Sequence, residues 1–355
     1  MTLKWSSVLL TGLFSMAVGC QPETQAPTLE SRAGALAGEV GTWTPTSAKT
    51  YPSTSAILLR GTGEVLDPYF GFVHRYDPYT NTWRAMNPMC SPGYCSNAVL
   101  TELPSGKVLA GVMFAGRMGG TPGMMLYDPG TDSWSHANAS YSRGSVTLLD
   151  SGKVLLAGGY TYLGGNLVPL ATAREYDPDS DTWTPLPGSM TTPRYGHSAT
   201  LLYSGKVLVT GGASSEAPAE LFDPSTGTWT ATSPMPHPGG EHRALRLYSG
   251  NVMVLVTTMG ASETPVDMYD PYNGRWFSGP ALPFTQPTSA TLLYSGEVLV
   301  VNNAGQAALY SPTQNAWLPA ASATASTSRG AAVLLHTGEV LLLNGSTPVA
   351  ERFSR

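Results

Sequence analysis

The stretch AELFDPSTGTW, residues 219–229, decides the fold because its frame recurs along the chain. Phe222 begins an aromatic-Asp-Pro sequence, and Trp229 follows the aromatic by seven positions. The same seven-residue spacing joins Tyr76 to Trp83, Tyr127 to Trp134, Tyr176 to Trp183, Tyr269 to Trp276 and Tyr310 to Trp317. Phe353 is a seventh such aromatic with no tryptophan after it, and Trp43 is a tryptophan with no such aromatic before it.

A second phrase runs in step with the first: a small residue, a glycine and a hydrophilic residue precede an apolar run, as in SGKVLL at 151–156. Its glycines lie 42 to 53 residues apart. They are Gly63, Gly106, Gly152, Gly205, Gly250, Gly296 and Gly338. A period of this length indicates a repeat architecture and not a domain with one central core.

Each repeat contains four strands and the turns between them, as residues 195–233 show. In the first strand segment, HSATLLYSG, polar and apolar residues alternate before a turn. The second, KVLVTGG, is an apolar run that ends in glycines. The third, AELFDP, leads into a turn, and the fourth, TWTATSPM, follows that turn. The glycine supplies the positive φ of a tight hairpin, and Asp-Pro predicts a type I turn. Seven four-stranded antiparallel blades bury both of their faces in a ring, so we predict an all-β, seven-bladed β-propeller.

The orphan residues at the two ends predict how this ring closes. The C-terminal repeat supplies three strands, RGAAVLLHTG, EVLLLNGS and VAERFSR, and lacks the fourth. GTWTP around Trp43 would complete it, with Trp43 beside Phe353. We expect the tyrosines and tryptophans of the repeats to fill the spaces between blades, each burying about 150–250 Å².

These residues resemble the Kelch-repeat family, in which a double glycine after an apolar strand precedes an aromatic and then a tryptophan. The double glycine is intact at Gly158-Gly159 and Gly211-Gly212. The resemblance covers residues 40–355, and the repeats are similar in style to the Kelch-like propellers of bacterial exported proteins. It implies closure of the ring by one terminus, and it leaves function open because this fold serves both binding proteins and enzymes.

The first twenty residues are separate from the repeats. Lys4 precedes the apolar segment SSVLLTGLFSMAV, and AVGC closes it, which resembles a bacterial lipoprotein signal peptide. The resemblance implies lipidation of Cys20, export, and anchoring to the outer membrane or cell surface; secretion after cleavage behind Gly19 is the alternative. We therefore divide the chain into a signal peptide at 1–20, a flexible tether at 21–38 and a propeller at 39–355.

Two further cysteines, Cys90 and Cys95, flank the turn pair Pro92-Gly93. Export would place them in an oxidising compartment, so we expect a disulfide, with two free thiols as the alternative.

The composition and charge of the chain argue against nucleic acid as a binding partner. The formal net charge is −5 and the pI is near 5.7, so the chain has no basic field for nucleic acid. Charged residues make up only 12%, which fits short strands and tight turns. We expect a monomer.

Recognition is expected on one face of the ring. The turns after the first and third strands are short and repetitive and lie on one face. The connections after the second and fourth strands lie on the other face, and the connection from the second to the third strand varies in length. We call this second face the variable-loop face. It carries the ligand-binding candidates Arg143, Tyr160, Tyr162, Arg194, Tyr195, His197, Glu241, His242 and Arg329. The arginines suit carboxylates or acidic sugars, and the tyrosines suit stacking; the alternative is that the arginines bond loop carbonyls of neighbouring blades.

The sequence contains no strong motif for catalysis or for metal binding. His237, Glu241 and His242 form a local cluster, PHPGGEH, without a strong metal spacing. DPDSDTW at 177–183 lacks the glycine and the distal glutamate of a calcium loop. No phosphate-cradling loop or nucleophile elbow is present in the sequence. We therefore expect a binding module for an envelope protein or glycan without metal or cofactor; the alternative is a carbohydrate-active enzyme, such as a sugar-acid mutarotase, working from the Arg/His rim of the channel.

Overall fold

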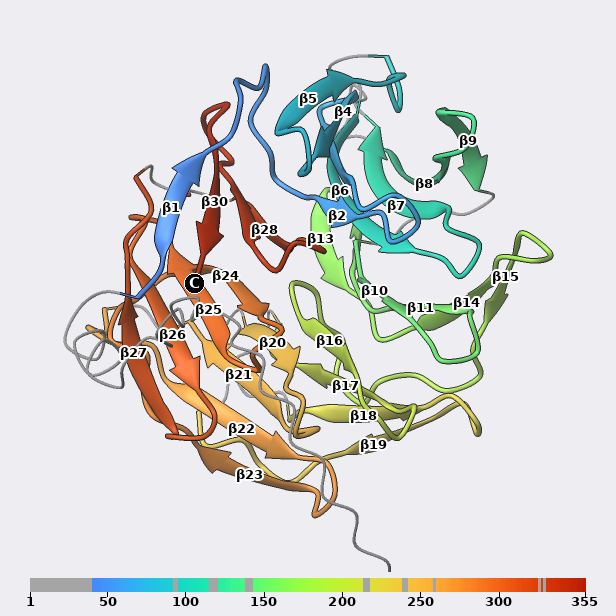
Figure 1. Cartoon of the computed structure of the whole chain (residues 1–355). Helices are drawn as coiled ribbons and strands as arrows, with labels where there is room; N and C mark the ends of the chain where they lie inside the picture. The colour runs from blue at the N-terminus through green and yellow to red at the C-terminus, as the bar shows by residue number, and fades with distance from the viewer. Residues whose placement is uncertain are drawn as a thin grey trace, which may run out of the picture. The chain divides into compact units, whose positions relative to one another are not determined.

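The protein is a seven-bladed β-propeller. The computed structural model describes residues 40–91, 95–114, 121–137, 143–212, 218–237, 242–257, 260–324, 327 and 330–355. These residues form seven four-stranded antiparallel sheets and one extra two-stranded sheet, and Figure 1 shows the blades arranged in a ring. Along the described residues, no helix is long and apolar enough to cross a membrane. The predicted fold class is confirmed.

The first four blades follow the repeats in order. Blade 1 consists of β2 (Ile57–Leu58), β3 (Val65–Tyr69), β4 (Phe72–Asp77) and β5 (Thr82–Ala85). Blade 2 consists of β6 (Cys95–Glu102), β7 (Val108–Phe114), β8 (Thr121–Asp128) and β9 (Ser133–Ala137). Blade 3 consists of β10 (Ser145–Leu148), β11 (Val154–Ala157), β14 (Ala173–Asp177) and β15 (Thr182–Pro185), and it also carries the hairpin of β12 (Tyr160–Leu163) and β13 (Asn166–Pro169). Blade 4 consists of β16 (Ser198–Leu201), β17 (Val207–Thr210), β18 (Glu220–Asp223) and β19 (Thr228–Ala231).

The remaining blades follow the same plan until the last one. Blade 5 consists of β20 (His242–Arg246), β21 (Val252–Val256), β22 (Val266–Asp270) and β23 (Arg275–Ser278). Blade 6 consists of β24 (Pro287–Leu292), β25 (Val298–Asn302), β26 (Ala307–Ser311) and β27 (Ala316–Ala320). Blade 7 consists of β28 (Ala331–Leu334), β29 (Val340–Leu343), β30 (Ala350–Ser354) and β1 (Thr42–Pro45).

Blade 7 is completed by the N-terminal strand, as the sequence predicts. β1 pairs antiparallel with β30, and Trp43 lies opposite Phe353. Their ring centroids are 5.0 Å apart, and the Trp43 Nε1 donates to the carbonyl of Ala321 in the preceding blade at 2.6 Å. The orphan tryptophan and the orphan aromatic therefore complete one split repeat.

The predicted turns are also present. All seven phrase glycines have positive φ, between 76° and 91°, in the hairpins that join first to second strands. In the Asp-Pro turns the aspartate accepts backbone N–H bonds; Asp177, for example, binds the amides of Asp179 and Ser180. DPDSDTW is thus a strand-joining turn.

The core consists of seven apolar clusters. Each lies between two neighbouring blades and includes the repeat aromatic of one of them. Tyr127 of blade 2, for example, packs with Leu66 and Val73 of blade 1. This arrangement confirms that the aromatics fill the spaces between blades and explains why the fold needs a closed ring.

Each repeat aromatic also pairs with its tryptophan across the third and fourth strands. Tyr176 lies opposite Trp183, and their centroids are 4.9 Å apart. The Tyr176 hydroxyl donates to Asp181 at 2.9 Å, and Asp181 has a positive φ of 48°. The equivalent position in blade 4 is Gly227, where the aromatic is a phenylalanine without a hydroxyl.

The structure joins Cys90 and Cys95 in a disulfide. Cys95 is buried and is the first residue of β6, so the bond closes a short loop at the start of blade 2. We call the first strand of each blade, such as β6, its inner strand and the fourth its outer strand.

Candidate functional site

The variable-loop face carries a polar pocket over blades 4, 5 and 6. The pocket has a volume of about 560 Å³ and is formed where the inner strands β16, β20 and β24 begin and β21 and β25 end. Its lining residues are Gly196, His197, Ser198, His242, Arg243, Thr257, Gln286, Pro287, Thr288 and Asn303. Most of these present hydrogen-bonding groups, which suits a polar ligand more than an apolar one.

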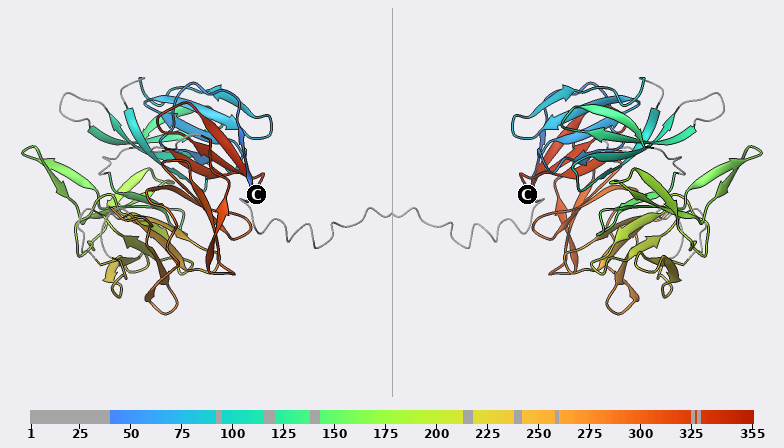
Figure 2. Two further views of the ribbon diagram at one scale, coloured as in Figure 1. Left: turned by 90° about the vertical axis from the view of Figure 1, so that its left-hand side faces the viewer. Right: turned by 90° about the vertical axis from the view of Figure 1, so that its right-hand side faces the viewer.

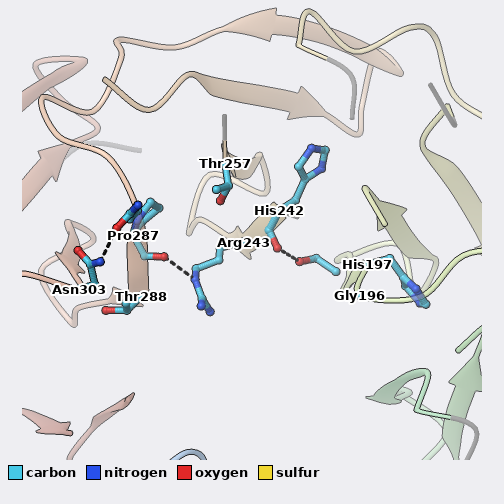
Figure 3. Close-up of a pocket in the computed structure, with 10 residues that line it drawn as sticks. Gly196, His197, His242, Arg243, Thr257, Pro287, Thr288 and Asn303 are labelled. Atoms are coloured by element: carbon cyan, nitrogen blue, oxygen red, sulfur yellow. Dashed lines mark hydrogen bonds between the residues drawn. The ribbon is translucent and has the colours of Figure 1, made fainter. Parts of the chain in front are cut away.

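Hydrogen bonds between neighbouring blades hold the floor of the pocket. The hydroxyl of Ser198 donates to the carbonyl of His242 at 2.6 Å, and Nε of Arg243 donates to the carbonyl of Pro287 at 2.8 Å (Figure 3). Each bond joins one inner strand to the next, so the lining residues sit on rigid strand ends and need little ordering when a ligand binds.

Arg243 is the charged group of this pocket. Its side chain is exposed, and Figure 3 shows it extending from β20 into the open space between the inner strands. Counted from the phrase glycine, the equivalent residue is serine in blades 3, 4 and 6, alanine in blades 1 and 7, and valine in blade 2. Arg243 was not among the residues predicted from the sequence, although a large cation at a position otherwise filled by small or aliphatic residues is a signal that could have revealed it.

His197 lies at the wall of the pocket and is held neutral. Its Nε2 is 2.9 Å from the hydroxyl of Ser145 in blade 3. Burial and, secondarily, the nearby charge of Arg194 lower the pKa of His197 to about 4. The imidazole is therefore a neutral hydrogen-bonding group at pH 7.

Arg194 is inside the protein and not on the rim. Its side chain is fully buried, pairs with Glu220 at 2.7 Å, and donates to the carbonyls of Gly211 and Pro218. Its role is structural, but the carbonyls that it binds belong to its own blade 4 and not, as the alternative for the arginines expected, to a neighbouring blade. Arg194 fixes the loop before β16 and thereby positions Tyr195 and His197.

Arg143, Tyr160, Tyr162 and Tyr195 come together as an aromatic cluster next to the pocket. The Arg143 guanidinium lies 4.7 Å from the centroid of the Tyr160 ring. Tyr160 makes edge contacts with Tyr162 at 5.7 Å and with Tyr195 at 5.3 Å. Because Tyr195 precedes the pocket residues Gly196 and His197 in the chain, the cluster and the pocket share one loop.

The β12–β13 hairpin extends this cluster outward, and it stands out from the body of the propeller in the side views of Figure 2. Tyr162 and Leu163 near its tip are 54% and 63% exposed. This segment was predicted as a variable loop, and its two strands were not predicted. Gly164-Gly165, both with positive φ, form the turn and were the available signal.

Three predicted site residues lie outside the described residues: Cys20, Glu241 and Arg329. His242 is buried at the start of β20, and His237 faces Asp267 with Nδ1 2.8 Å from the carboxylate. Among the described residues, no group of three histidine, cysteine or acidic side chains is arranged to hold a metal ion.

No family model matches the chain, and comparison with curated proteins found no match. The class that the structure defines is the seven-bladed β-propeller, and the function has to be argued from the site.

Proposed function

We propose that this protein is an exported, lipid-anchored propeller of the Kelch type that binds a glycan or a polar segment of an envelope protein on its variable-loop face and performs no catalysis. The observation that carries the binding role is the pocket of about 560 Å³ to which three blades contribute polar groups. Rigid strand ends with one exposed guanidinium suit a ligand that bears hydroxyl and carboxylate groups.

The surroundings of the pocket support a ligand larger than one sugar unit. The aromatic cluster at Tyr160 and Tyr195 offers flat rings beside the pocket, and the exposed apolar tip of the β12–β13 hairpin adds a second contact surface. A chain of sugar units, or a loop of a neighbouring protein, reaches from the pocket to these rings.

The state of His197 favours binding over the enzymatic alternative. A general acid or base works best when its pKa lies near the working pH. With a pKa of about 4, His197 is a weak base at neutral pH and serves better as a fixed hydrogen-bonding partner.

The anchoring part of the proposal rests on the leader sequence. Residues 1–20 resemble a lipoprotein signal peptide that ends at Cys20, and the tether-like composition of 21–38 follows it. Radiolabelled palmitate incorporated by the full chain in a bacterial host, and lost on Cys20→Ser, supports lipid anchoring; equal labelling of both proteins contradicts it.

The binding part is tested with a panel of neutral and acidic glycans and with solubilised envelope proteins. The purified protein is compared with Arg243→Ala and with the control Arg275→Ala, which removes an exposed arginine of the same blade from outer strand β23. We expect Arg243→Ala to weaken binding at least tenfold, because a hydrogen bond to a charged group contributes about 1.5–3 kcal/mol. Equal binding by all three proteins would exclude this pocket as the site.

A further inference from the structure

Blade 1 buries an aspartate against a lysine from the segment that leads into it. Lys49 lies between β1 and β2, and its ammonium nitrogen contacts Oδ2 of Asp67 in β3. Both side chains are fully buried. Ser53, also buried, donates to the same carboxylate oxygen at 2.7 Å and accepts from Lys49.

Neither charge is required by the propeller fold. Asp67 lies opposite His74 in the second strand of its blade, and the residues at this place in the other six blades are Ala110, Leu156, Val209, Val254, Val300 and Leu342. Lys49 follows Trp43 by six positions. In four of the other six repeats the residue at this spacing is buried and apolar, namely Met89, Met235, Leu282 and Ala323, and in the other two it is a serine. No other repeat has a charged residue at either position, so the pair pays a desolvation cost that the shared fold does not require.

The walls of this site are aromatic. The Lys49 nitrogen lies 4.9 Å from the centroid of Trp83, while Tyr51 stacks on Phe72 at 4.1 Å and contacts His74. Within the described residues, Oδ1 of Asp67 and Nδ1 of His74 are buried without hydrogen-bonding partners. The ion pair is thus only partly satisfied, and the site is shielded from water.

Such surroundings favour the uncharged forms of both partners. Burial lowers the pKa of Lys49 and raises the pKa of Asp67, although each partner opposes the shift of the other. Moving one proton from the ammonium to the carboxylate yields an amine, which is nucleophilic, next to a carboxylic acid, which is electrophilic.

We propose that Lys49 and Asp67 condense to an intramolecular amide bond. The Nζ lone pair attacks Cγ of Asp67 to form the C–N bond, and the C–O bond to one carboxyl oxygen breaks. That oxygen leaves as water with the proton that the carboxyl group took from the ammonium and one further proton from the amine. The reaction needs no oxidant or other reactant. The fixed contact supplies the proximity that lets an intramolecular reaction proceed, and the hydroxyl of Ser53 polarises the carboxyl group.

The bond would lock the seam of the ring. The segment after β1 already joins blade 7 to blade 1, because the amide of Ser53 donates to Asn344 and the Trp83 Nε1 donates to Thr46. An amide from Lys49 to β3 fixes the closing strand to blade 1 covalently, where otherwise hydrogen bonds and packing hold it.

Peptide mass spectrometry of the purified full chain, after denaturation, reduction and trypsin digestion, tests the proposal. Trypsin cannot cleave after an acylated lysine, so we expect residues 33–60 and 61–75 to appear as one branched peptide, one water lighter than the sum of its parts. Separate, unmodified peptides ending at Lys49 and at Arg75 would overturn the proposal.

Mild acid gives an independent readout on the same sample. Asp-Pro bonds break in acid with help from the free aspartate carboxyl, and Asp67 is followed by Pro68. The five other Asp-Pro bonds of the chain are internal controls. We expect these to break while the bond after Asp67 resists; breakage at all six contradicts the cross-link. Lys49→Arg, which keeps a charge but cannot form this amide, should restore breakage after Asp67.

Discussion

Phe353→Ala removes the side chain at the centre of the closing blade. Phe353 is 1% exposed and packs in the cluster between blades 6 and 7 with Leu299 and Leu342. Loss of a buried phenylalanine costs about 3–5 kcal/mol. The pair with Trp43, whose centroid is 5.0 Å away, adds about 0.5–1.5 kcal/mol, so we expect the upper part of that range.

Urea unfolding followed by tryptophan fluorescence measures this loss of unfolding free energy. The matched control is Phe277→Ala on outer strand β23, because Phe277 is 46% exposed and its removal should cost less than about 1.5 kcal/mol. A double-mutant cycle with Trp43→Ala should show a coupling of about 0.5–1.5 kcal/mol. Equal costs for Phe353→Ala and Phe277→Ala, with no coupling to Trp43, would refute closure by the N-terminal strand.

Two further predictions concern single polar groups. Tyr176→Phe should lower the unfolding free energy by about 1 kcal/mol, because it deletes the hydrogen bond to Asp181. Tyr269→Phe should lower it by less, since Gly274 stands at the equivalent turn position and has no side-chain acceptor. Urea unfolding of both variants at pH 7 gives the comparison. His197 has a folded-state pKa of about 4, below its ordinary value of about 6.5, so unfolded chains bind the proton first and stability falls by up to about 3 kcal/mol as the pH drops from 7 to 4. His197→Gln should make the unfolding midpoint less steep in pH over this window, and an unchanged slope would show that His197 is not held neutral.

The fold was predictable because short spacings within each repeat determine which residues pair and where the chain turns. The seven-residue gap from Tyr176 to Trp183 is the register of two paired strands, and the phrase glycines mark hairpins that need positive φ. The closing strand was also predictable, because Trp43 and Phe353 each lacked a partner that every other repeat has.

The site was less predictable because its geometry joins residues from different repeats. The sequence shows that Arg194 precedes an inner strand, but only the structure shows that it forms a buried ion pair with Glu220. Arg243 and Asn303 meet in one pocket although they are far apart in the chain. Lys49 and Asp67 were missed for the same reason, since neither residue belongs to a recognisable motif and their significance appears only when equivalent positions of the blades are compared.

The most direct test of the binding account is hydrogen exchange of the purified protein with and without the tightest-binding member of the glycan panel. We expect the ligand to slow exchange at the pocket segments 194–198, 242–246 and 285–289. Exchange at the hairpins 103–107 and 202–206 on the opposite face should stay unchanged. Slower exchange confined to those hairpins or to the outer strands would contradict the binding account.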